Sequence, residues 1–262
     1  MKIYTLMENT TCNEALACEH GLSLYIEAAG KRILFDAGQT GAFADNAEKM
    51  GIDLSQVDIC ILSHGHYDHG GGLKRFLEVN DHAPIYVSRH AFGDYYNGEE
   101  KYIGLDWELL NEERITFVRD NLTLTEQLSL HACSGFPQPY YTDAYGMQAK
   151  RKDALEVDDF RHEMYLLIRD GDRRIIISGC SHRGVMNIKT WFAPHVFIGG
   201  FHLMKLDPEK EATRLKFTAM ELLKKETVYY TGHCTGEKQY EALKTHMGDR
   251  LRRLSTGAIY EL

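Results

Sequence analysis

The chain has 262 residues, of which 44% are hydrophobic and 26% are charged, and its formal net charge is −8. This length and composition are typical of a soluble globular protein that buries a large core. The negative balance argues against sequence-independent binding to DNA or RNA, which needs a basic face, and no apolar run approaches the roughly 20 residues of a membrane-spanning helix.

The N-terminal segment and the cysteines bear on the compartment of the protein. Residues 1–7 alternate like a strand and lack the charged start, apolar centre and small-residue cleavage site of a signal peptide, so we expect a cytoplasmic protein. The six cysteines are widely spaced without a CxxC pair, and free thiols are the default for such a chain. The sequence has no short repeat and no linker rich in Pro, Gly or Ser, and it therefore predicts one domain over residues 1–262.

Strand patterns dominate the first third of the chain. Residues 2–6, 22–28 and 32–36 are β-rich runs, with a turn at Gly30 and Lys31 between the last two. Short helices are predicted at 41–50 and 73–79, and further strands at 57–62 and 84–87. The run at 57–62 is largely apolar, as in a strand that is buried on both faces.

Two middle segments have weaker patterns. Residues 89–113 are rich in Tyr, Glu and Gly, and we predict one or two helices there over the mouth of a site. Residues 140–159 are a long polar stretch. We interpret this stretch as a substrate-side loop, because long connections within compact domains are usually mobile or functional. Whether either segment closes over the site as a lid is left open by the sequence.

Regular patterns return in the second half. Residues 163–169 and 173–178 flank Asp170-Gly171-Asp172, a strong hairpin signal. Further strands are predicted at 196–198, 228–230 and 258–262, and helices near 185–191, at 209–225 and at 237–247. Pro208 precedes the second of these helices, as is typical of a helix start.

Four of the predicted strands lead directly into loops that contain histidine and glycine. The loops carry His64, His66, Asp68 and His69 after the strand at 57–62, and then His182, His202 and His233 after three later strands. Glycines let the chain turn sharply where a strand stops, and side chains on strand-end loops of a rigid sheet can converge on one spot.

Imidazole and carboxylate groups together suit divalent ions such as Zn, Fe, Mn, Ni or Co. A tight His-x-His-x-Asp-His loop can point its first two histidines one way and its Asp-His pair another way, which would serve two adjacent ions. Asp36, at the end of the strand at 32–36, is a candidate to orient a metal-bound histidine. Its alternative role is a turn aspartate that caps the following helix.

Other residues receive ordinary interpretations. Cys180 and Cys234 lie beside predicted ligands, and packing is favoured over metal ligation for both because free cysteine is a common small buried residue. The remaining histidines are interpreted as core or surface residues: His20, His82, His90, His131, His162, His195 and His246.

The segment HGHYDH at 64–69 resembles the HxHxDH signature of the metallo-β-lactamase superfamily. Further segments resemble a subgroup labelled 7,8-dihydropterin-6-yl-methyl-4-(β-D-ribofuranosyl)aminobenzene 5′-phosphate synthase-like: EHGLS at 19–23, LFDAG at 34–38, GCSH at 179–182, GGFHL at 199–203 and HCTG at 233–236. The resemblance implies an α/β (α+β) fold of the αββα sandwich type, in which two mixed β-sheets pack face to face with helices outside. It also implies one or two divalent ions, zinc first with iron or manganese as alternatives, and metal ligands at His64, His66, Asp68, His69, His182 and His233.

The chain departs from the hydrolytic members of this superfamily at one position. Those members usually have a strand-end Gly-Asp whose carboxylate bridges two metals, whereas the corresponding segment here reads Gly179-Cys180. Asp159 and Glu163 are candidates for a replacement carboxylate; otherwise they are a loop charge and a strand-start charge.

The resemblance implies a metal-dependent hydrolase or phosphate-transfer enzyme that acts on a small phosphorylated or otherwise anionic substrate. A metal ion lowers the pKa of bound water from ~15.7 towards ~7. Asp68 would orient or deprotonate this water, bind the second metal, or do both. His202 would face the developing charge or the anionic group of the substrate.

Alternative functions remain at this stage. One is a pterin-type synthase with metal-assisted loss of pyrophosphate, as the subgroup label implies, and another is a di-iron redox or gas-binding protein on the same fold. The second is weakened by His66, because that group typically carries a glutamate in this motif. A non-enzymatic, metal-stabilised module fits less well with candidate ligands at four strand ends. We expect a small-molecule substrate, no nucleic acid and no membrane, and the oligomeric state stays open.

Overall fold

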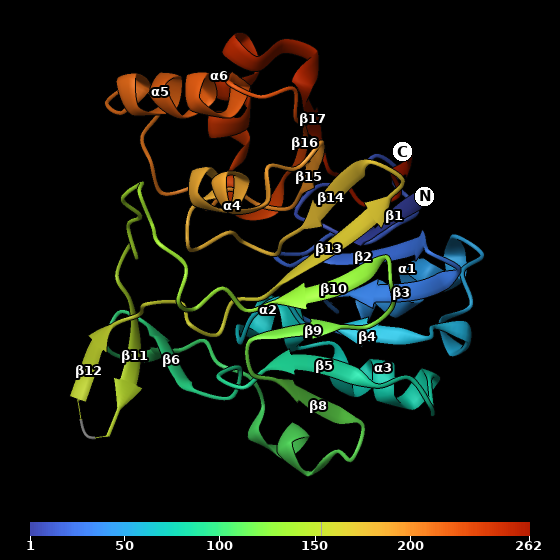
Figure 1. Ribbon diagram of the computed structural model, residues 1–262. Coiled ribbons are helices and arrows are strands. Elements are labelled where there is room, and N and C mark those ends of the chain that lie inside the picture. The colour runs from blue at the N-terminus through green and yellow to red at the C-terminus, as the bar shows by residue number, and fades with distance from the viewer. Residues whose placement is uncertain (153) are drawn as a thin grey trace.

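The computed structural model describes residues 1–152 and 154–262. Its centre is a pair of seven-stranded β-sheets that lie face to face, with helices on both outer sides (Figure 1). Each sheet contains parallel and antiparallel neighbours. The expected αββα sandwich of two mixed sheets is therefore confirmed.

The first sheet contains the N-terminal strands and the last strand of the chain. Its members are β1 (Lys2–Met7), β2 (Ser23–Ala28), β3 (Lys31–Phe35), β4 (Ile59–Ile61), β5 (Ile85–Ser88), β8 (Ile115–Val118) and β18 (Ile259–Glu261). Their order in the sheet is β18-β1-β2-β3-β4-β5-β8.

The second sheet is formed by the later part of the chain. Its members are β9 (Asn121–Thr123), β10 (Leu128–His131), β13 (Tyr165–Asp170), β14 (Arg173–Ile177), β15 (Val196–Ile198), β16 (Val228–Thr231) and β17 (Leu251–Arg253). Their order is β17-β16-β15-β14-β13-β10-β9. Because β14, β15 and β16 are parallel neighbours, their last residues meet at the same edge of the sheet.

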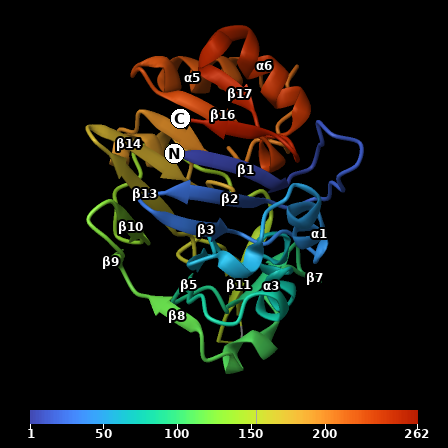
Figure 2. The ribbon, with the colours of Figure 1, turned by 90° about the vertical axis from the view of Figure 1, so that its right-hand side faces the viewer.

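Helices cover the outer face of each sheet. The helices are α1 (Ala42–Lys49), α2 (Tyr67–Gly70), α3 (Leu73–Val79), α4 (Val185–Phe192), α5 (Ala212–Leu223) and α6 (Glu237–Met247). Short 3-10 helices are η1 (Leu54–Gln56), η2 (Trp107–Asn111), η3 (His233–Thr235) and η4 (Gly248–Arg250). Figures 1 and 2 both show α5 and α6 far from α1 and α3, with strands between the two sets.

Alternating side chains along the strands build the apolar layers. In β3, Ile33 and Phe35 belong to the core between the two sheets, whereas Leu34 belongs to the core beneath α1 and α3. In β14, Ile175 belongs to the central core, whereas Ile176 packs beneath α4, α5 and α6. Since both faces of these strands are covered, continuous apolar runs are the sequence pattern that they require.

A third, four-stranded sheet occupies the two segments with weak sequence patterns. It contains β6 (Asp94–Asn97), β7 (Lys101–Tyr102), β11 (Met147–Arg151) and β12 (Ala154–Val157), in the order β12-β11-β6-β7. The prediction of one or two helices within 89–113 is wrong apart from η2, and residues 140–159 contain a β-hairpin as well as a loop. Residue 153 of that predicted loop lies outside the described residues.

The pairing of β6 with β11 joins segments that are far apart in the chain. A short sequence window contains only one of the two paired segments. Within each segment the alternation of apolar and polar residues is weak, so neither strand is predicted from its own sequence. Tyr95, Ile103 and Ala149 form a small separate core on this sheet.

The other predicted strands and helices are confirmed, with ends that differ by a few residues. The sequence patterns predict no strand at β8, β9, β10 or β17, which are short and partly exposed. In the described residues, no helix combines the length and the apolar character that crossing a bilayer requires. The single domain over residues 1–262 stays a prediction.

Candidate metal centre

The histidine-containing loops after β4, β14, β15 and β16 converge beyond the ends of these strands. The loop after β4 carries His64 and His66 and continues into α2, which carries Asp68 and His69. The six residues expected to bind metal are all buried: His64, His66, Asp68, His69, His182 and His233. They form two adjoining groups of donor atoms.

The first group contains His64, His66 and His182, whose donor nitrogens lie within 4.8 Å of one another. Nε2 of His64 is 3.2 Å from Nε2 of His182. Nε2 of His66 is buried and has no hydrogen-bond partner among the described residues. Three converging imidazole nitrogens match the protein ligands of an open, catalytic type of zinc site.

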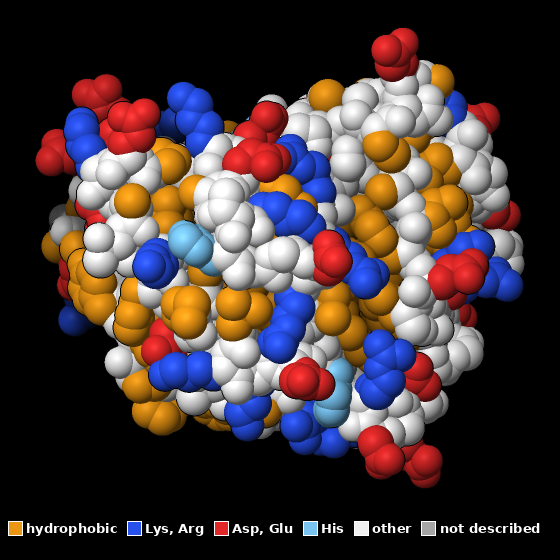
Figure 3. All heavy atoms as spheres, turned by 90° about the horizontal axis from the view of Figure 1, so that it is seen from above, with side chains coloured by type: hydrophobic (Ala, Val, Ile, Leu, Met, Phe, Trp, Pro, Cys, Tyr) orange, Lys and Arg blue, Asp and Glu red, His pale blue; other side chains and the backbone are white. Residues whose placement is uncertain are grey.

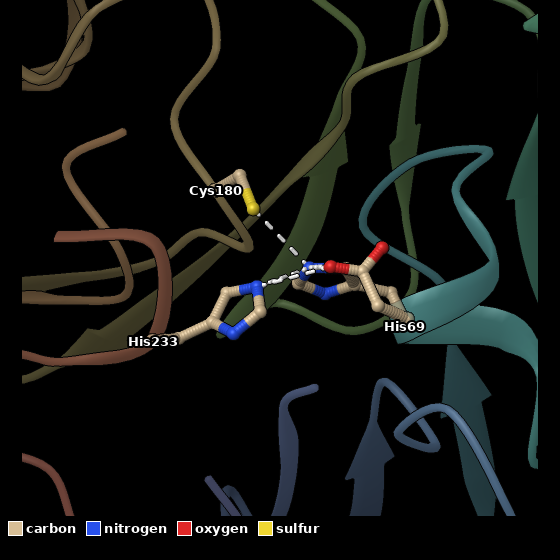
Figure 4. A group of neighbouring side chains, drawn as sticks. His69, Cys180 and His233 are labelled. Atoms are coloured by element: carbon tan, nitrogen blue, oxygen red, sulfur yellow. Dashed lines mark hydrogen bonds and ion pairs between the residues drawn. The ribbon is translucent and has the colours of Figure 1, made fainter. Parts of the chain in front are cut away.

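The second group contains Asp68, His69, Cys180 and His233. Figure 4 labels His69, Cys180 and His233 and shows their side chains close together. Nε2 of His69 lies 3.1 Å from Nε2 of His233 and 3.2 Å from Sγ of Cys180. Oδ2 of Asp68 lies 3.3 Å from Nε2 of His233. The ring centroids of His64 and His69 are 4.2 Å apart, so the two groups are immediate neighbours.

Asp36 determines which nitrogen carries the proton in two of these histidines. Its Oδ2 accepts hydrogen bonds from Nδ1 of His69 at 2.7 Å and from Oγ of Ser63 at 2.8 Å. Since the Ser63 hydroxyl donates to Asp36, its oxygen accepts the Nδ1 proton of His64 at 2.8 Å. Nε2 is then the unprotonated nitrogen of neutral His64 and of neutral His69. The expected contact between Asp36 and a histidine of the cluster is thus present.

Asp36→Asn should lower the metal affinity of the centre about 10- to 100-fold, as changes in the hydrogen-bond partners of metal ligands typically do. In asparagine an NH2 group replaces one of the two carboxylate oxygens, so the side chain cannot accept at both Oδ1, from the backbone N–H of Ser63, and Oδ2, from Oγ of Ser63 and Nδ1 of His69. Competition with a chromophoric chelator would measure the affinity. Asp81→Asn, at a fully exposed carboxylate, is the control, and equal affinities in both variants would contradict the orienting role.

Asn9 and His20 form a second set of contacts to the candidate metal ligands, which local sequence patterns do not reveal. Oδ1 of Asn9 accepts a hydrogen bond from Nδ1 of His233 at 2.8 Å, and its Nδ2 donates to Nδ1 of His20 at 3.2 Å. His20 then carries its proton on Nε2, which lies 3.3 Å from Oδ2 of Asp68. By its local sequence His20 is an ordinary residue, and only its place in the family-like segment at 19–23 links it to the site.

In these protonation states, two ring nitrogens that carry no proton lie next to each other. Nε2 of His233 and Nε2 of His69 are 3.1 Å apart, while the protons of both rings are on Nδ1. Two lone pairs at this distance repel, so a positive charge, either a proton or a metal ion, is required between them. Burial lowers the pKa of His69, but the carboxylates of Asp36 and Asp68 outweigh it and raise the pKa overall. The donor set therefore fits a bound cation.

The other histidines of the two groups are neutral at neutral pH. Burial is the main cause: it lowers the pKa of His66 to about 3 and the pKa of His233 to about 4. Burial and neighbouring histidines hold the pKa values of His64 and His182 well below the usual range. Neutral imidazole is the form that binds a metal ion.

Chelator-treated protein should lose stability as the pH falls below about 6.5. An unfolded histidine takes up a proton near that pH, whereas His66 and His233 in the folded chain remain neutral down to about 3 and about 4. The unfolded state therefore binds more protons in this window, and the free energy of unfolding falls by about 1.4 kcal/mol per pH unit for each such histidine. Urea denaturation between about pH 7 and pH 5 measures the slope, and a free energy that does not change over this range would contradict it.

Backbone strain accompanies the site. Asp36, His202 and His233 have positive φ angles of 61°, 53° and 49°. Residues other than glycine rarely adopt such angles, and those that do cluster at functional sites. Gly179 meets a different constraint, because a Cβ there would lie 2.2 Å from Oγ of Ser63. Only glycine lets the end of β14 approach the loop that carries His64.

The second donor group contains a thiol and, besides Asp68, no further carboxylate among the described residues. Sγ of Cys180, for which packing was favoured, lies among the donor atoms beside His69. The carboxylate of Glu163 instead accepts hydrogen bonds from the backbone N–H groups at 182 and 183, and Asp159 forms ion pairs with two arginines. Neither acid belongs to a potential metal group of residues 1–152 and 154–262, so the suggestion that one of them replaces the bridging aspartate is wrong.

His202, the second predicted catalytic residue, lies beside the first group. Its ring centroid is 4.2 Å from that of His182. Burial is the main cause that lowers its pKa to about 4, so it is a neutral imidazole at neutral pH. Neither of its ring nitrogens has a hydrogen-bond partner in the described part of the chain.

His162 also adjoins the site, although its local sequence does not mark it. It is fully buried, its Nδ1 accepts a hydrogen bond from the N–H of Gly65 at 3.0 Å, and its Nε2 lies 3.0 Å from Oδ2 of Asp158. His66, Asp158 and His162 form a further group of potential donors. His162 comes from a loop far from residue 65 in the chain, so only the fold brings them together.

Comparisons with known proteins show the family of the chain. A family model described as the metallo-beta-lactamase superfamily matches residues 17–137. MJ0448, an uncharacterized protein of Methanocaldococcus jannaschii, is 32% identical over 213 residues, which cover 77% of this chain and 79% of the relative. The 7,8-dihydropterin-6-methyl-4-(beta-D-ribofuranosyl)-aminobenzene-5'-phosphate synthase of the same organism is 30% identical over 292 residues, with coverage of 99% and 96%.

Solved structures share the fold. Tm1679, described as a metal-dependent hydrolase of the beta-lactamase superfamily, has a TM-score of 0.83 and 27% identity, and the match covers 100% of this chain and 99% of that chain. Zn(2+)-bound PqqB from Methylobacterium extorquens has a TM-score of 0.60 and 12% identity, with full coverage of both chains (100%); this likeness concerns the fold alone.

Proposed function

Because the chain belongs to the metallo-β-lactamase superfamily, we propose that it is a metal-dependent enzyme that hydrolyses a small anionic substrate, with phosphoesters as the first candidates. The observation that carries the proposal is the pair of adjoining, buried donor groups at the ends of β4, β14 and β16. The relatives described as a synthase and as a metal-dependent hydrolase support an enzyme rather than a binding module.

Two divalent ions are the proposed cofactors. His64, His66 and His182 would hold the first ion, and Asp68, His69, Cys180 and His233 would hold the second. Zinc suits a mixture of imidazole, carboxylate and thiolate donors, and iron and manganese are alternatives. When bound, such ions supply Lewis acidity and make hydroxide available from water near neutral pH.

Asp68 is the proposed proton acceptor. Burial alone would raise its pKa, but the charge of His69 and the hydrogen bond from Nε2 of His20 hold the pKa well below its usual range. The carboxylate is therefore ionised at neutral pH. Its Oδ2, among the donor atoms of the second group, can orient a water molecule, take its proton or bind the second ion.

His202 is the proposed contact for the anionic group of the substrate. A neutral imidazole carries a proton on one ring nitrogen, and neither nitrogen of His202 has a partner among the described residues. Its N–H is consequently free to donate to an oxygen of the substrate. The N–H donor would stabilise negative charge that grows on that oxygen during the reaction.

Elemental analysis and turnover of the purified, tag-free protein test this proposal together. We expect about two equivalents of divalent metal, hydrolysis of a small phosphoester such as bis(4-nitrophenyl) phosphate, loss of both on chelation and recovery on adding the metal back. About one equivalent would restrict the proposal to a mononuclear site. Metal-loaded protein without turnover of any phosphoester would overturn the hydrolytic function.

A synthase reaction is the second candidate, because the relative that matches nearly the whole chain is named as a synthase. Such a reaction would join a pterin to an aminobenzene with loss of pyrophosphate. Release of pyrophosphate that depends on the aminobenzene acceptor would favour this candidate, whereas release into water alone would favour the hydrolase. Both reactions would use the same proposed metal ligands.

A small molecule, rather than a nucleic acid, is the proposed substrate. The net charge of −8 opposes binding to a phosphate backbone. Figure 3 shows positive and negative side chains interspersed over the face that carries α5 and α6, without a continuous basic surface in this view.

A further inference from the structure

A cavity of about 250 Å³ adjoins the first donor group. Its wall includes His182, His202 and two residues of opposite charge, Asp143 and Arg214. Apolar side chains make up much of the rest, among them Val185, Phe201, Leu203 and Phe217. An apolar cavity with a few polar groups beside a candidate catalytic centre is the usual place for the part of a substrate that does not react.

Three side chains of this wall contain buried polar atoms without a partner. Oη of Tyr145, both ring nitrogens of His202 and Nδ1 of His182 are buried and make no hydrogen bond with any described residue. The rings of Tyr145 and His202 are close, with centroids 5.4 Å apart. Leaving such a group unsatisfied costs about 1–3 kcal/mol, and native structures rarely gather several of them in one place. A ligand with hydrogen-bonding atoms would satisfy them.

The backbone holds Tyr145 in this position. Its φ angle of 49° is left-handed, which is unfavourable for tyrosine. Oδ1 of Asp143 accepts a hydrogen bond from the N–H of Tyr145 at 2.8 Å, and Nζ of Lys205 donates to its carbonyl oxygen at 2.7 Å. Burial raises the pKa of the Tyr145 hydroxyl, so the group is a neutral donor and acceptor at neutral pH.

We propose that this cavity binds an uncharged aromatic ring whose edge carries hydrogen-bonding atoms, and that Tyr145 is the residue that recognises this edge. The inference rests on the proposed function and narrows it: the substrates would be aryl or heteroaryl phosphoesters, with the ring in the cavity and the ester at the adjoining donor groups. Aromatic side chains line the wall, and aromatic rings pack favourably against one another in tilted or offset arrangements.

The volume agrees with one ring or two fused rings. An apolar cavity of about 150 Å³ accepts benzene, and drug-sized ligands occupy pockets of about 300–1,000 Å³. The cavity of about 250 Å³ lies between these sizes. The neutral hydroxyl of Tyr145 suits an amide or ring-nitrogen edge, and the two charged residues of the wall, Asp143 and Arg214, are of opposite sign and leave it without a net charge.

Calorimetric titration of the purified protein with benzamide, and with cyclohexanecarboxamide as the non-aromatic match, tests the proposal without turnover. We expect tighter binding of benzamide. Tyr145→Phe removes one hydroxyl, keeps the ring and should weaken benzamide binding about three- to ten-fold, the effect of one hydrogen bond. Val185→Phe should block binding by filling the cavity. Tyr96→Phe, on β6 and outside the cavity wall, is the matched control and should bind benzamide like the parent.

Equal affinity for the two amides, undetectable benzamide binding, or unchanged affinity in Tyr145→Phe would each overturn the proposal. Metal content, measured on the same samples, separates this result from the proposed function. If the protein binds benzamide but contains no metal, the ring-binding cavity is supported and the hydrolytic function is overturned. If the protein hydrolyses phosphoesters but does not prefer the aromatic amide, the hydrolytic function is supported and the ring-binding cavity is overturned.

Discussion

Replacement of His66 by alanine should remove about one of two metal equivalents and lower phosphoester turnover by at least about 100-fold. Even changes in the partners of metal ligands lower affinity or activity about 10- to 100-fold, and this change removes one of only three nitrogens in the first group. Nε2 of His66 makes no hydrogen bond with the described residues, so its loss breaks no internal hydrogen bond at that atom. Elemental analysis and initial rates measure the two effects.

His246→Ala is the control for this prediction. His246 is exposed on α6 and belongs to none of the potential metal groups of the described residues. Its replacement should leave both metal content and turnover unchanged. If His66→Ala keeps two equivalents and full activity while it folds normally, His66 is not a ligand and the first site needs another composition.

Replacement of Cys180 by alanine should remove the second metal equivalent and leave the first in place. Sγ of Cys180 lies in the position that faces His69, where it adds a thiolate to two imidazoles and one carboxylate. A thiolate favours zinc over manganese or magnesium. Cobalt-substituted protein should therefore show thiolate-to-cobalt charge-transfer absorption, and this absorption should be absent in Cys180→Ala.

Cys60→Ala provides a matched control, because Cys60 is also a fully buried free thiol but lies in the core beneath α1 and α3. It should keep both metals and the charge-transfer band. Cys180→Asp should shift the metal preference from zinc towards manganese, since carboxylates suit harder ions. A charge-transfer band that survives in Cys180→Ala would assign the thiolate to another cysteine, with Cys234 as the nearest candidate.

The sequence by itself predicted strands that are covered on both faces and a set of candidate metal ligands, and its resemblance to the metallo-β-lactamase superfamily implied the αββα architecture. Apolar runs such as 57–62 and 173–178 mark strands whose two faces are covered, and this property depends on local composition. The loop at 64–69 concentrates four candidate donors in six residues, so its role is readable from local spacing. The later histidines could be predicted as candidates because each directly follows a strand, and these strands end at the same edge of the second sheet.

Only the tertiary structure decided how these residues are combined. Whether Cys180 packs or faces His69 depends on how the end of β14 meets the loop after β4, across the two sheets. The hydrogen bonds from Asn9 to His20 and His233 join opposite ends of the chain. The carboxylate of Glu163 accepts hydrogen bonds from backbone N–H groups at 182 and 183 instead of joining the metal groups, and only the fold brings those N–H groups to it. The small sheet depends on the pairing of β6 with β11. The common reason is that these contacts are long-range, and side-chain direction at such contacts is set by packing between elements rather than by the spacing of residues along the chain.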